Sequence, residues 1–312
     1  MAKDPLLTVV SIAGARRERV QRMLRSILDQ DIADQIVIIV YDRTENPKRD
    51  LPELNRTNVI YEPVDMKSTL GRLQKRAVLT ASTDVIAFIE EHVVVPAGWA
   101  RESLRLHGQG YAGVTGVFAS GNPQHRFARI IFSITYGNWI LSRQGGETTD
   151  IPGDNSTFIR SKLLKFEDEL EVLLSTDILL IRRLVADGEK LYRAANLTLK
   201  HWNENLFLDG WIALLYWNQM YICNRLAIEK WSPWRRILRF LTIPLVPFVR
   251  AWKSYRRAKE NAEDMRQFFS DLPQSFLLHA GSATGMAAGL LFGYQESVCR
   301  FTDCETNARR WD

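Results

Sequence analysis

Cysteine is scarce in this 312-residue sequence, which contains only three. They are Cys223, Cys299 and Cys304, and none of them forms a Cys-x-x-Cys pair. These are too few for a disulfide framework, so a reducing compartment such as the cytoplasm is expected. The first residues, MAKDPLLTVVSIAG, also lack an apolar stretch long enough for a signal peptide, and export by that route is not expected.

Two kinds of catalytic pattern are missing as well. No Ser-His-Asp or Cys-His nucleophile pattern is evident, and the glycines at 145 and 146 do not form a phosphate-binding loop. What is present is 46% hydrophobic and 25% charged residues, enough for one sizeable core and an appendage. The net charge of +5 is concentrated between Lys230 and Lys259, where nine Lys or Arg residues occur without an acidic one.

Strand-like and helix-like segments alternate along the first hundred residues. Buried strands are predicted at Leu6–Ile12, Gln35–Tyr41 and Asn58–Tyr61, which are short apolar runs. Helices are predicted at Glu18–Gln30 and Leu70–Ala81, where apolar residues recur at helical spacing. This alternation predicts an α/β fold with a largely parallel sheet, whose ligand-binding loops lie at one edge.

The segment from Val85 to His92 combines a strand with three charged or ring side chains. Val85–Ile89 is apolar without a polar break, which is typical of a strand buried on both faces. Glu90, Glu91 and His92 follow at its carboxyl end, where ligands collect in open α/β sheets. Two carboxylates and an imidazole suit Mg²⁺ or Mn²⁺. A charged strand end that faces water is the alternative.

Pro96, Gly98 and Trp99 come soon after these three residues. An acidic group after an apolar strand, followed by Pro and a Gly-Trp pair, resembles the metal-binding segment of family 2 glycosyltransferases, and the Glu-Glu-His version resembles one branch of their bacterial members. The resemblance implies a GT-A (nucleotide-diphospho-sugar transferase) fold with a mixed, mostly parallel central sheet. It also implies that a hexosyl group is transferred with inversion from a UDP- or GDP-type sugar to a saccharide or lipid-linked hydroxyl, as in polysaccharide biosynthesis, with Mg²⁺ or Mn²⁺.

The same resemblance implies where the nucleotide sugar binds. Asp42, at the end of the second strand, matches the Asp that contacts the base, and Arg72 matches a basic residue of the loop before the central helix. An ordinary turn Asp and a solvated surface Arg are the alternatives. The nucleotide-binding residues predicted from these loops are Ala13, Gly14, Asp42, Gly71, Arg72, Glu90 and Glu91.

Asp177 takes the place of the family's catalytic base, because Ser175, Thr176 and Asp177 correspond to its Glu-Asp-x-x-Leu motif. A capped helix N-terminus favours a nearby carboxylate, which would hold Asp177 ionised at a fixed geometry. A first-turn helix Asp without a catalytic role is the alternative. We therefore predict that Asp177 takes the proton from the acceptor hydroxyl.

Two further residues follow from the resemblance. The segment IPGDNSTFIR at 151–160 resembles the family's Gly-x-Asn segment and places Asn155 on the acceptor side of the site. The strand Asn196–His201 ends where the family core ends in a His. A structural histidine at a strand end is the alternative. The predicted metal ligands are Glu90, His92 and His201.

The composition changes after residue 205, so a catalytic domain at 1–205 and a helical region at 206–312 are predicted. Phe207–Leu226 is aromatic but interrupted by polar residues. The apolar centre Phe240–Val249 is too short to cross a bilayer and is flanked by Trp and by Lys or Arg. It predicts an interfacial anchor for anionic lipids at the cytoplasmic face of the membrane. A cationic tail packed on the catalytic domain is the alternative, and no nucleic-acid-binding motif accompanies it.

Glycines recur every four residues in the uncharged segment Phe276–Tyr294, at positions 281, 285, 289 and 293. A smooth strip of this kind lets another helix approach closely. We predict that it packs against a helix of the same chain or of a second subunit, the latter giving a homo-oligomer. A membrane-spanning helix, a re-entrant helix, a helix buried in protein and a loop-rich segment all remain open.

Together these patterns predict a membrane-associated, inverting glycosyltransferase with a helical extension. A function of another class is a catalytically silent, membrane-bound nucleotide-sugar sensor or assembly subunit. A measurement of catalytic turnover would distinguish the transferase from the silent sensor or subunit.

Overall fold

The computed structural model describes residues 4–140, 144–259 and 262–306, and their contacts divide them into two units. The first unit holds the residues up to Ala119, Trp139–His201, Glu305 and Thr306. The second holds Ser120–Asn138 and Trp202–Cys304. This division differs from a single boundary at residue 205, because the segment 120–138 groups with the C-terminal helices while residues 305 and 306 group with the sheet.

A nine-stranded sheet forms the centre of the first unit in the part of the chain that the structure describes. The strand order is β3-β2-β1-β4-β8-β6-β9-β5, and β7 pairs with β9. β8 runs antiparallel to both of its neighbours, β4 and β6, whereas β3, β2, β1 and β4 are parallel. The strands are β1 (Leu7–Ala13), β2 (Ile36–Asp42), β3 (Val59–Pro63), β4 (Val85–Phe88), β5 (Val93–Val94), β6 (Gly113–Ser120), β7 (Gly146–Thr148), β8 (Ser156–Ile159) and β9 (Leu191–His201).

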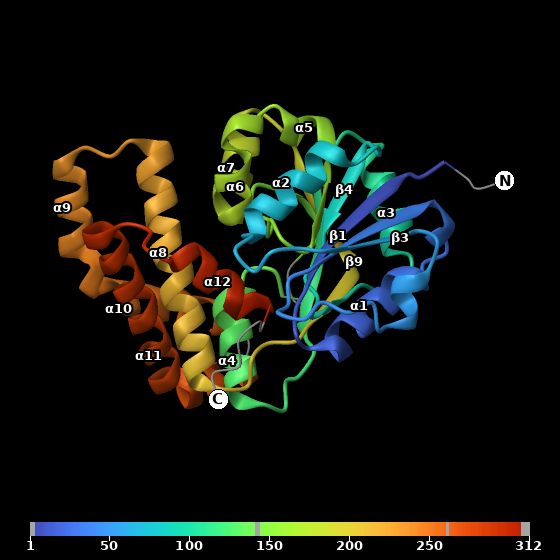
Figure 1. Ribbon diagram of the computed structural model, residues 1–312. Helices are drawn as coiled ribbons and strands as arrows, with labels where there is room; N and C mark the ends of the chain where they lie inside the picture. Colours follow the sequence, from blue (N-terminus) through green and yellow to red (C-terminus); the bar gives the residue numbers. More distant parts are fainter. Residues whose placement is uncertain (1–3, 141–143, 260–261, 307–312) are drawn as a thin grey trace. The chain divides into compact units, whose positions relative to one another are not determined.

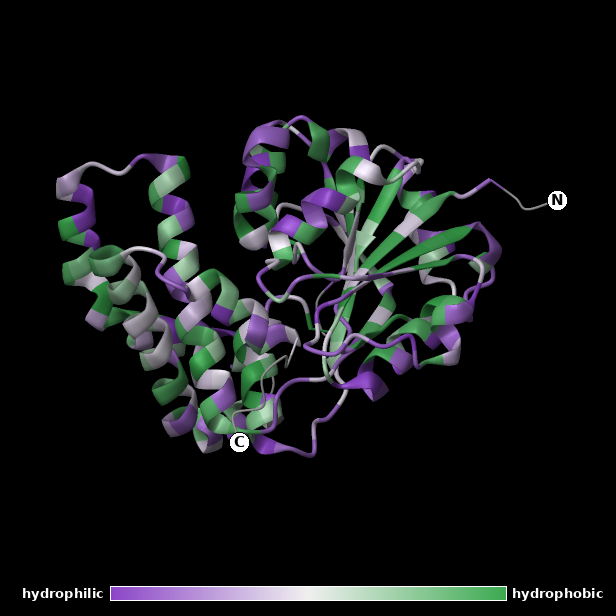
Figure 2. Ribbon diagram, in the orientation of Figure 1, coloured by the Kyte–Doolittle hydropathy of each residue, from purple (hydrophilic) through white to green (hydrophobic). Residues whose placement is uncertain are grey.

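The strands at the centre of the sheet are apolar along their whole length. Every residue of β1 and of β4 is buried, as expected for strands covered on both faces. Figure 2 shows these hydrophobic strands in green. The predicted α/β class with a mixed, mostly parallel central sheet is confirmed. The strand predicted at Asn196–His201 is the second half of a longer strand, β9, which begins at Leu191.

Helices flank this sheet. α2 and α6 pack against each other, and Figure 1 shows α5 and α7 beside them. The contact between α2 and α6 is very close, because a Cβ on Gly71 would lie 2.3 Å from the carbonyl oxygen of Glu171. The α-helices of this unit are α1 (Arg17–Leu28), α2 (Leu70–Thr80), α3 (Trp99–His107), α5 (Arg160–Leu164), α6 (Leu170–Ser175) and α7 (Asp177–Ala186). Short 3-10 turns occur at η1 (Ala33–Gln35), η2 (Pro52–Asn55) and η3 (Glu167–Glu169).

The second unit is helical. α11 packs along α8 and α10, which lie beside it in Figure 1. A small apolar core is formed by Ile130, Ile131, Leu214 and Leu278. Its helices are α4 (Arg126–Thr135), α8 (Phe207–Glu229), α9 (Pro233–Thr242), η4 (Ile243–Leu245), α10 (Val246–Ala258), α11 (Ala262–Phe292) and most of α12 (Ser297–Thr306).

The glycine strip of α11 faces α8. A Cβ on Gly285 would lie 2.0 Å from the carbonyl oxygen of Leu215, and one on Gly289 would lie 2.8 Å from that of Gln219. The strip therefore serves the close approach of two helices of the same chain, one of the two predicted arrangements. Gly293 lies just beyond the helix in the left-handed region, with φ 73°. A homo-oligomer stays a prediction, and this strip no longer supports it.

Among the described residues, one helical segment is long and apolar enough to cross a membrane, Met265–Phe292 of α11. Length and composition are weak evidence, because core helices share them. Nearly half of its most apolar window is buried against other parts of the protein.

Candidate metal centre and donor pocket

Strand register brings two distant histidines together. β5 pairs antiparallel with β9 so that Val93 lies opposite His201, which places His92 beside that ring. The Nε2 atoms of His92 and His201 are 3.2 Å apart. Glu90 Oε2 lies 3.2 Å from His201 Nε2 and 3.6 Å from His92 Nε2. One oxygen and two nitrogens thus converge at the end of β4, and this group could hold a metal ion.

The chemistry of these donors fits a divalent cation. Burial alone would raise the pKa of Glu90, but the charge of His92 and the hydrogen bond and charge of His201 outweigh it and lower the pKa to about 2. The carboxylate is therefore ionised throughout the neutral range and ready to ligate. Both rings are more than nine-tenths buried, so their positions are fixed by packing. Two imidazoles and one carboxylate form a ligand set typical of Zn²⁺, Mn²⁺ and related ions.

Asn155 holds Glu90 in place. Its side-chain NH₂ donates to Glu90 Oε2, and its side-chain oxygen accepts the backbone N–H of Glu90 at 3.0 Å. Asn155 is fully buried with φ 61°, a left-handed conformation that Asn tolerates better than most residues. The structure thus places Asn155 beneath a candidate metal ligand, where it positions Glu90. It does not line the pocket described below, so the acceptor-side role inferred from the sequence stays a prediction without support from this geometry.

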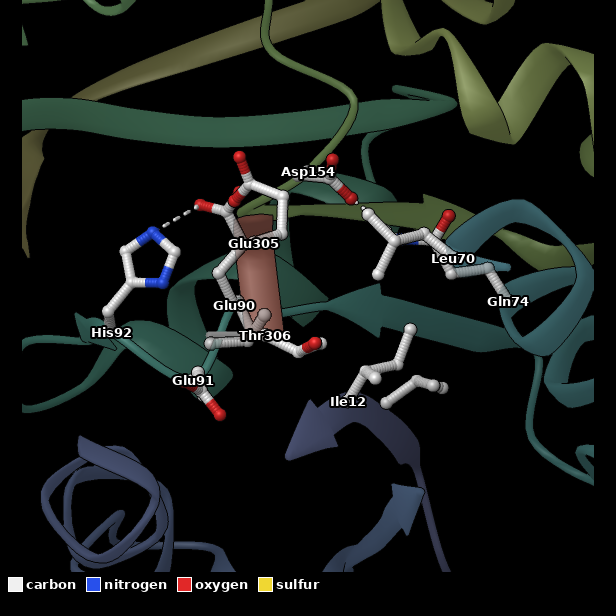
Figure 3. A pocket seen from close by; sticks show the side chains of 11 residues that line it. Ile12, Leu70, Gln74, Glu90, Glu91, His92, Asp154, Glu305 and Thr306 are labelled. Carbon is white, nitrogen blue, oxygen red and sulfur yellow. Dashed lines mark hydrogen bonds and ion pairs between the residues drawn. The ribbon is translucent and has the colours of Figure 1, made fainter. Parts of the chain in front are cut away.

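Glu91 points away from the other two members of the triplet (Figure 3). Its carboxylate is buried and accepts the backbone N–H of Gly14. Burial is the largest influence on Glu91 and raises its pKa to about 8, although the bond from Gly14 opposes the shift. Glu91 therefore anchors the loop after β1.

The loop Ala13–Ala15 is closed by the far end of the chain. The backbone N–H of Ala15 donates to the carbonyl oxygen of Thr306 at 3.1 Å, and the guanidinium of Arg43 donates to the Thr306 hydroxyl at 3.3 Å. A Cβ on Gly14 would overlap Thr306, so only glycine fits there. Ala13 and Gly14, both predicted to bind the nucleotide, thus lie beside Thr306, which lines the pocket described below, but they do not line that pocket themselves.

Three other predicted nucleotide-binding residues, Asp42, Gly71 and Arg72, also lie outside this pocket. Asp42 is buried and accepts hydrogen bonds from Arg17 at 2.8 Å and from the Tyr61 hydroxyl at 2.6 Å. Burial, followed by the bond to Asp42, raises the pKa of Tyr61 to about 12. Arg72 is exposed on α2. A contact of Asp42 or Arg72 with the base remains a prediction, and the same applies to Gly71, whose observed neighbour is α6.

Asp177 begins α7 and is held by two backbone groups. Its Oδ2 accepts the N–H of Gly153 at 3.0 Å, and its Oδ1 accepts the N–H of Ile178 at 2.8 Å. Burial raises the pKa of Asp177, the negative charges of Glu90 and Asp150 add to the shift, and the two backbone bonds oppose it. A carboxylate with a raised pKa is a stronger base than an ordinary aspartate, which suits the predicted role.

A pocket lies at the carboxyl end of β4, and neither Asp177 nor His201 lines it. Its lining residues are Val10, Ile12, Leu70, Gln74, Ile89, Glu90, Glu91, His92, Asp154, Glu305 and Thr306. Figure 3 shows the carboxyl groups of Glu90, Asp154 and Glu305 gathered on one side of it. Sequence analysis missed Asp154, Gln74 and Glu305. Asp154 adjoins the predicted Asn155, which was its only sequence signal, and nothing in the sequence indicated that Gln74 or Glu305 would lie here.

Comparison with known proteins gives a similarity of structure. No protein-family model matches the chain, and no curated protein matches it. Among solved structures, it is similar to the crystal structure of S. aureus TarS residues 1–349 in complex with UDP, with a TM-score of 0.49 and 11% sequence identity. The match covers 91% of this chain and 90% of that chain.

Proposed function

We propose that this protein is a metal-dependent glycosyltransferase that moves a hexosyl group from a nucleotide-diphosphate sugar to a hydroxyl acceptor. The observation that carries the proposal is the convergence of Glu90, His92 and His201 at the carboxyl end of a buried parallel strand, beside a pocket lined by further carboxyl groups. Ligands bind at that edge in open α/β sheets. The strand order, with β8 reversed between β4 and β6, agrees with the GT-A arrangement implied by the sequence.

The residues divide the chemistry between them. Glu90, His92 and His201 would hold the ion, which supplies positive charge to the leaving diphosphate when bound. Asp177 takes the proton from the acceptor hydroxyl as that oxygen attacks the anomeric carbon. The backbone N–H groups of Gly153 and Ile178 fix the Asp177 carboxylate during this step. One displacement inverts the anomeric carbon.

The ligand set favours Mn²⁺ over Mg²⁺. Mg²⁺ prefers oxygen ligands and keeps several waters, whereas imidazole nitrogen suits later first-row ions. His92 and His201 supply two of the three protein donors. Of the two ions expected from the sequence, Mn²⁺ is therefore the proposed cofactor.

The segment from α9 to α10 supports a membrane-associated enzyme. Nine of its apolar side chains face outward, with exposed fractions between 39% and 70%. Two of its arginines face inward instead. Arg239 contacts Met286, and Arg250 donates to Ser282 and Asn218 at 2.8 Å each. These outward residues, here called the apolar patch, are Trp234, Ile237, Leu238, Phe240, Leu241, Leu245, Phe248, Val249 and Trp252.

An apolar face directed to water is unfavourable at about 25 cal/mol per Å². Burial at a lipid surface removes that cost, and the basic residues of 230–259 favour anionic headgroups. We therefore place the enzyme at the cytoplasmic face of a membrane. A saccharide or lipid-linked acceptor for polysaccharide biosynthesis fits that location, and membership of family 2 is part of this proposal.

The test is turnover. The purified protein with Mn²⁺ is incubated with UDP- and GDP-sugars, and release of nucleoside diphosphate is measured with and without chelator. We expect release only with metal, no transfer by Asp177→Asn, and unchanged donor binding by that variant. Asp187→Asn, at the other end of α7, is the matched control. Equal turnover by Asp177→Asn would refute the base assignment. Donor binding by the wild type without turnover under any condition would instead favour the silent sensor or assembly subunit.

A further inference from the structure

Three successive residues in the loop before β8 each contact a different part of the site. The N–H of Gly153 donates to Asp177, the proposed base. The side chain of Asn155 forms two hydrogen bonds with Glu90, a proposed metal ligand. Asp154 lies between them and lines the pocket. The chain thus sets the position of Asp154 relative to both the base and the metal ligand.

Asp154 is oriented by one neighbour from α2. Its Oδ1 accepts a hydrogen bond from Gln74 Nε2 at 2.7 Å. The Gln74 side chain is 6% exposed, and its oxygen is buried without a partner among the described residues. Both side chains line the pocket. The amide NH₂ of Gln74 faces Asp154, which leaves the Gln74 oxygen as a second acceptor at the pocket wall.

The pKa of Asp154 is affected by two other residues of the site. Burial is the largest influence on it and raises its pKa well above the usual range, and the negative charges of Glu90 and Asp177 act in the same direction. The charges of the proposed metal ligand and of the proposed base therefore both act on Asp154. In a single displacement, the transferred sugar lies between the metal-held diphosphate and the base that activates the acceptor.

We propose that Asp154, positioned by Gln74, binds ring hydroxyl groups of the transferred sugar and that this sugar is neutral. The inference rests on the proposed function and names the donor class. Hydroxyl groups are donors that match the acceptors supplied by Asp154 and Gln74. A polar site of this kind rejects a ligand that leaves its acceptors unpaired.

The same pocket disfavours an acidic sugar. Carboxyl groups of Glu90, Asp154 and Glu305 all line it, so a uronate would bring a further carboxyl group into a partly buried acidic space, which disfavours its charged form. Among the described residues that line the pocket, none is a lysine or an arginine, and the diphosphate would bind the ion held by Glu90, His92 and His201. Hexoses and N-acetylhexosamines meet no such repulsion.

The experiment compares nucleotides with and without a sugar. Calorimetry with the full chain and Mn²⁺ measures binding of UDP, UDP-glucose, UDP-galactose, UDP-N-acetylglucosamine and UDP-glucuronate, and of GDP, GDP-mannose and GDP-mannuronate. In the series that the wild type accepts, we expect at least one neutral sugar ester to bind about tenfold or more tighter than the uronate ester. Asp154→Ala and Asp154→Asn are compared with Asp150→Asn, a nearby aspartate that does not line the pocket.

Asp154→Ala should weaken the neutral sugar ester about tenfold or more and leave the nucleoside diphosphate unchanged. Gln74→Leu should raise KM for the donor with a smaller effect on kcat, and Gln74→Asn should restore part of the loss. Equal losses for sugar ester and free nucleotide, or no loss for either, would overturn the inference. So would preferred binding of the uronate ester. If the wild type binds no nucleotide, the proposed function itself is refuted. That outcome is measured on the wild type alone, so it is distinct from a failure of the Asp154 variants.

Discussion

His92 Nε2 and His201 Nε2 lie 3.2 Å apart although 109 residues separate them in the chain. Their rings meet edge to face, with centroids 4.6 Å apart. Two rings at this distance place two nitrogen donors on one side of Glu90 Oε2. The antiparallel pairing of β5 with β9 produces this geometry, so the site depends on strand register as much as on ligand identity.

Removal of one ring should weaken metal binding. In His201→Ala, Glu90 and His92 remain as the only protein donors of the group, so Mn²⁺ affinity should fall at least about tenfold. Calorimetric titration with Mn²⁺ and Zn²⁺ measures the effect. His125→Ala, which removes an exposed histidine, should bind like the wild type. Unchanged affinity in His201→Ala and in His92→Ala would reduce both rings to a structural role.

Asn155 should control the metal ligand without touching the metal. Asn155→Gly tolerates φ 61° but loses both contacts with Glu90, so Mn²⁺ affinity should fall about 10- to 100-fold. Asn155→Ala loses the same contacts and adds backbone strain, which should lower the free energy of unfolding by a further ~1 kcal/mol. Urea unfolding and metal titration of both variants separate these effects. Wild-type metal affinity in Asn155→Gly would contradict the positioning role.

The buried His107 should make stability depend on pH. Its Nδ1 donates to the Tyr111 carbonyl oxygen, and its Nε2 contacts the Thr157 hydroxyl, each at 2.7 Å. Burial lowers the pKa of His107 to about 4 from the ordinary 6.5, although the bond to Tyr111 opposes this. Between these values the unfolded chain binds a proton that the folded chain does not. Stability should therefore fall as pH drops from about 6.5 to 4, by roughly 3 kcal/mol at most.

Urea unfolding at pH 7, 5.5 and 4.5 tests this dependence. His107→Gln stays neutral and should lose this part of the dependence, while the exposed His125→Gln should keep it. A wild type and a His107→Gln variant with parallel stability curves would show that His107 does not titrate in this range.

The apolar patch should hold the protein on anionic vesicles. At low salt the wild type should pellet with phosphatidylglycerol vesicles, and high salt should release it only in part, because screening weakens the ionic attraction but not apolar burial. The double variant Leu241→Glu, Phe248→Glu should stay in the supernatant. Ile60→Glu changes an equally exposed apolar residue on β3 and should pellet normally. Absence of the wild type from low-salt pellets would remove the membrane proposal.

The sheet and the candidate metal group were predictable because their signals are local. Apolar runs bounded by turns gave β1, β2 and β4, and the triplet at 90–92 follows β4 directly. His201 was predicted from its order after Asp177 in the family pattern. The roles within the triplet were not predictable, because it lies in the turn between β4 and β5, where no strand alternation sets the direction of a side chain. Glu91 bonds to Gly14, while Glu90 meets His201.

The remaining site residues depend on contacts that no local pattern encodes. In the sequence, Gln74 is one polar position on an amphipathic helix. Its contact with Asp154 depends on the packing of α2 beside the loop that carries Asp154. Asn155 has a left-handed backbone conformation, which Asn and Gly also adopt in ordinary turns. Likewise, the outward direction of the apolar patch was predicted from composition, but the inward direction of Arg250 required its partners on two other helices.

Thr306 contacts Arg43 across 263 residues of sequence. A ribosome makes the strands of the sheet long before it makes this residue. Until then Ala15 lacks its carbonyl partner, and the part of the pocket wall formed by Thr306 is missing. A nascent chain should therefore display most of a formed sheet well before the pocket described here exists.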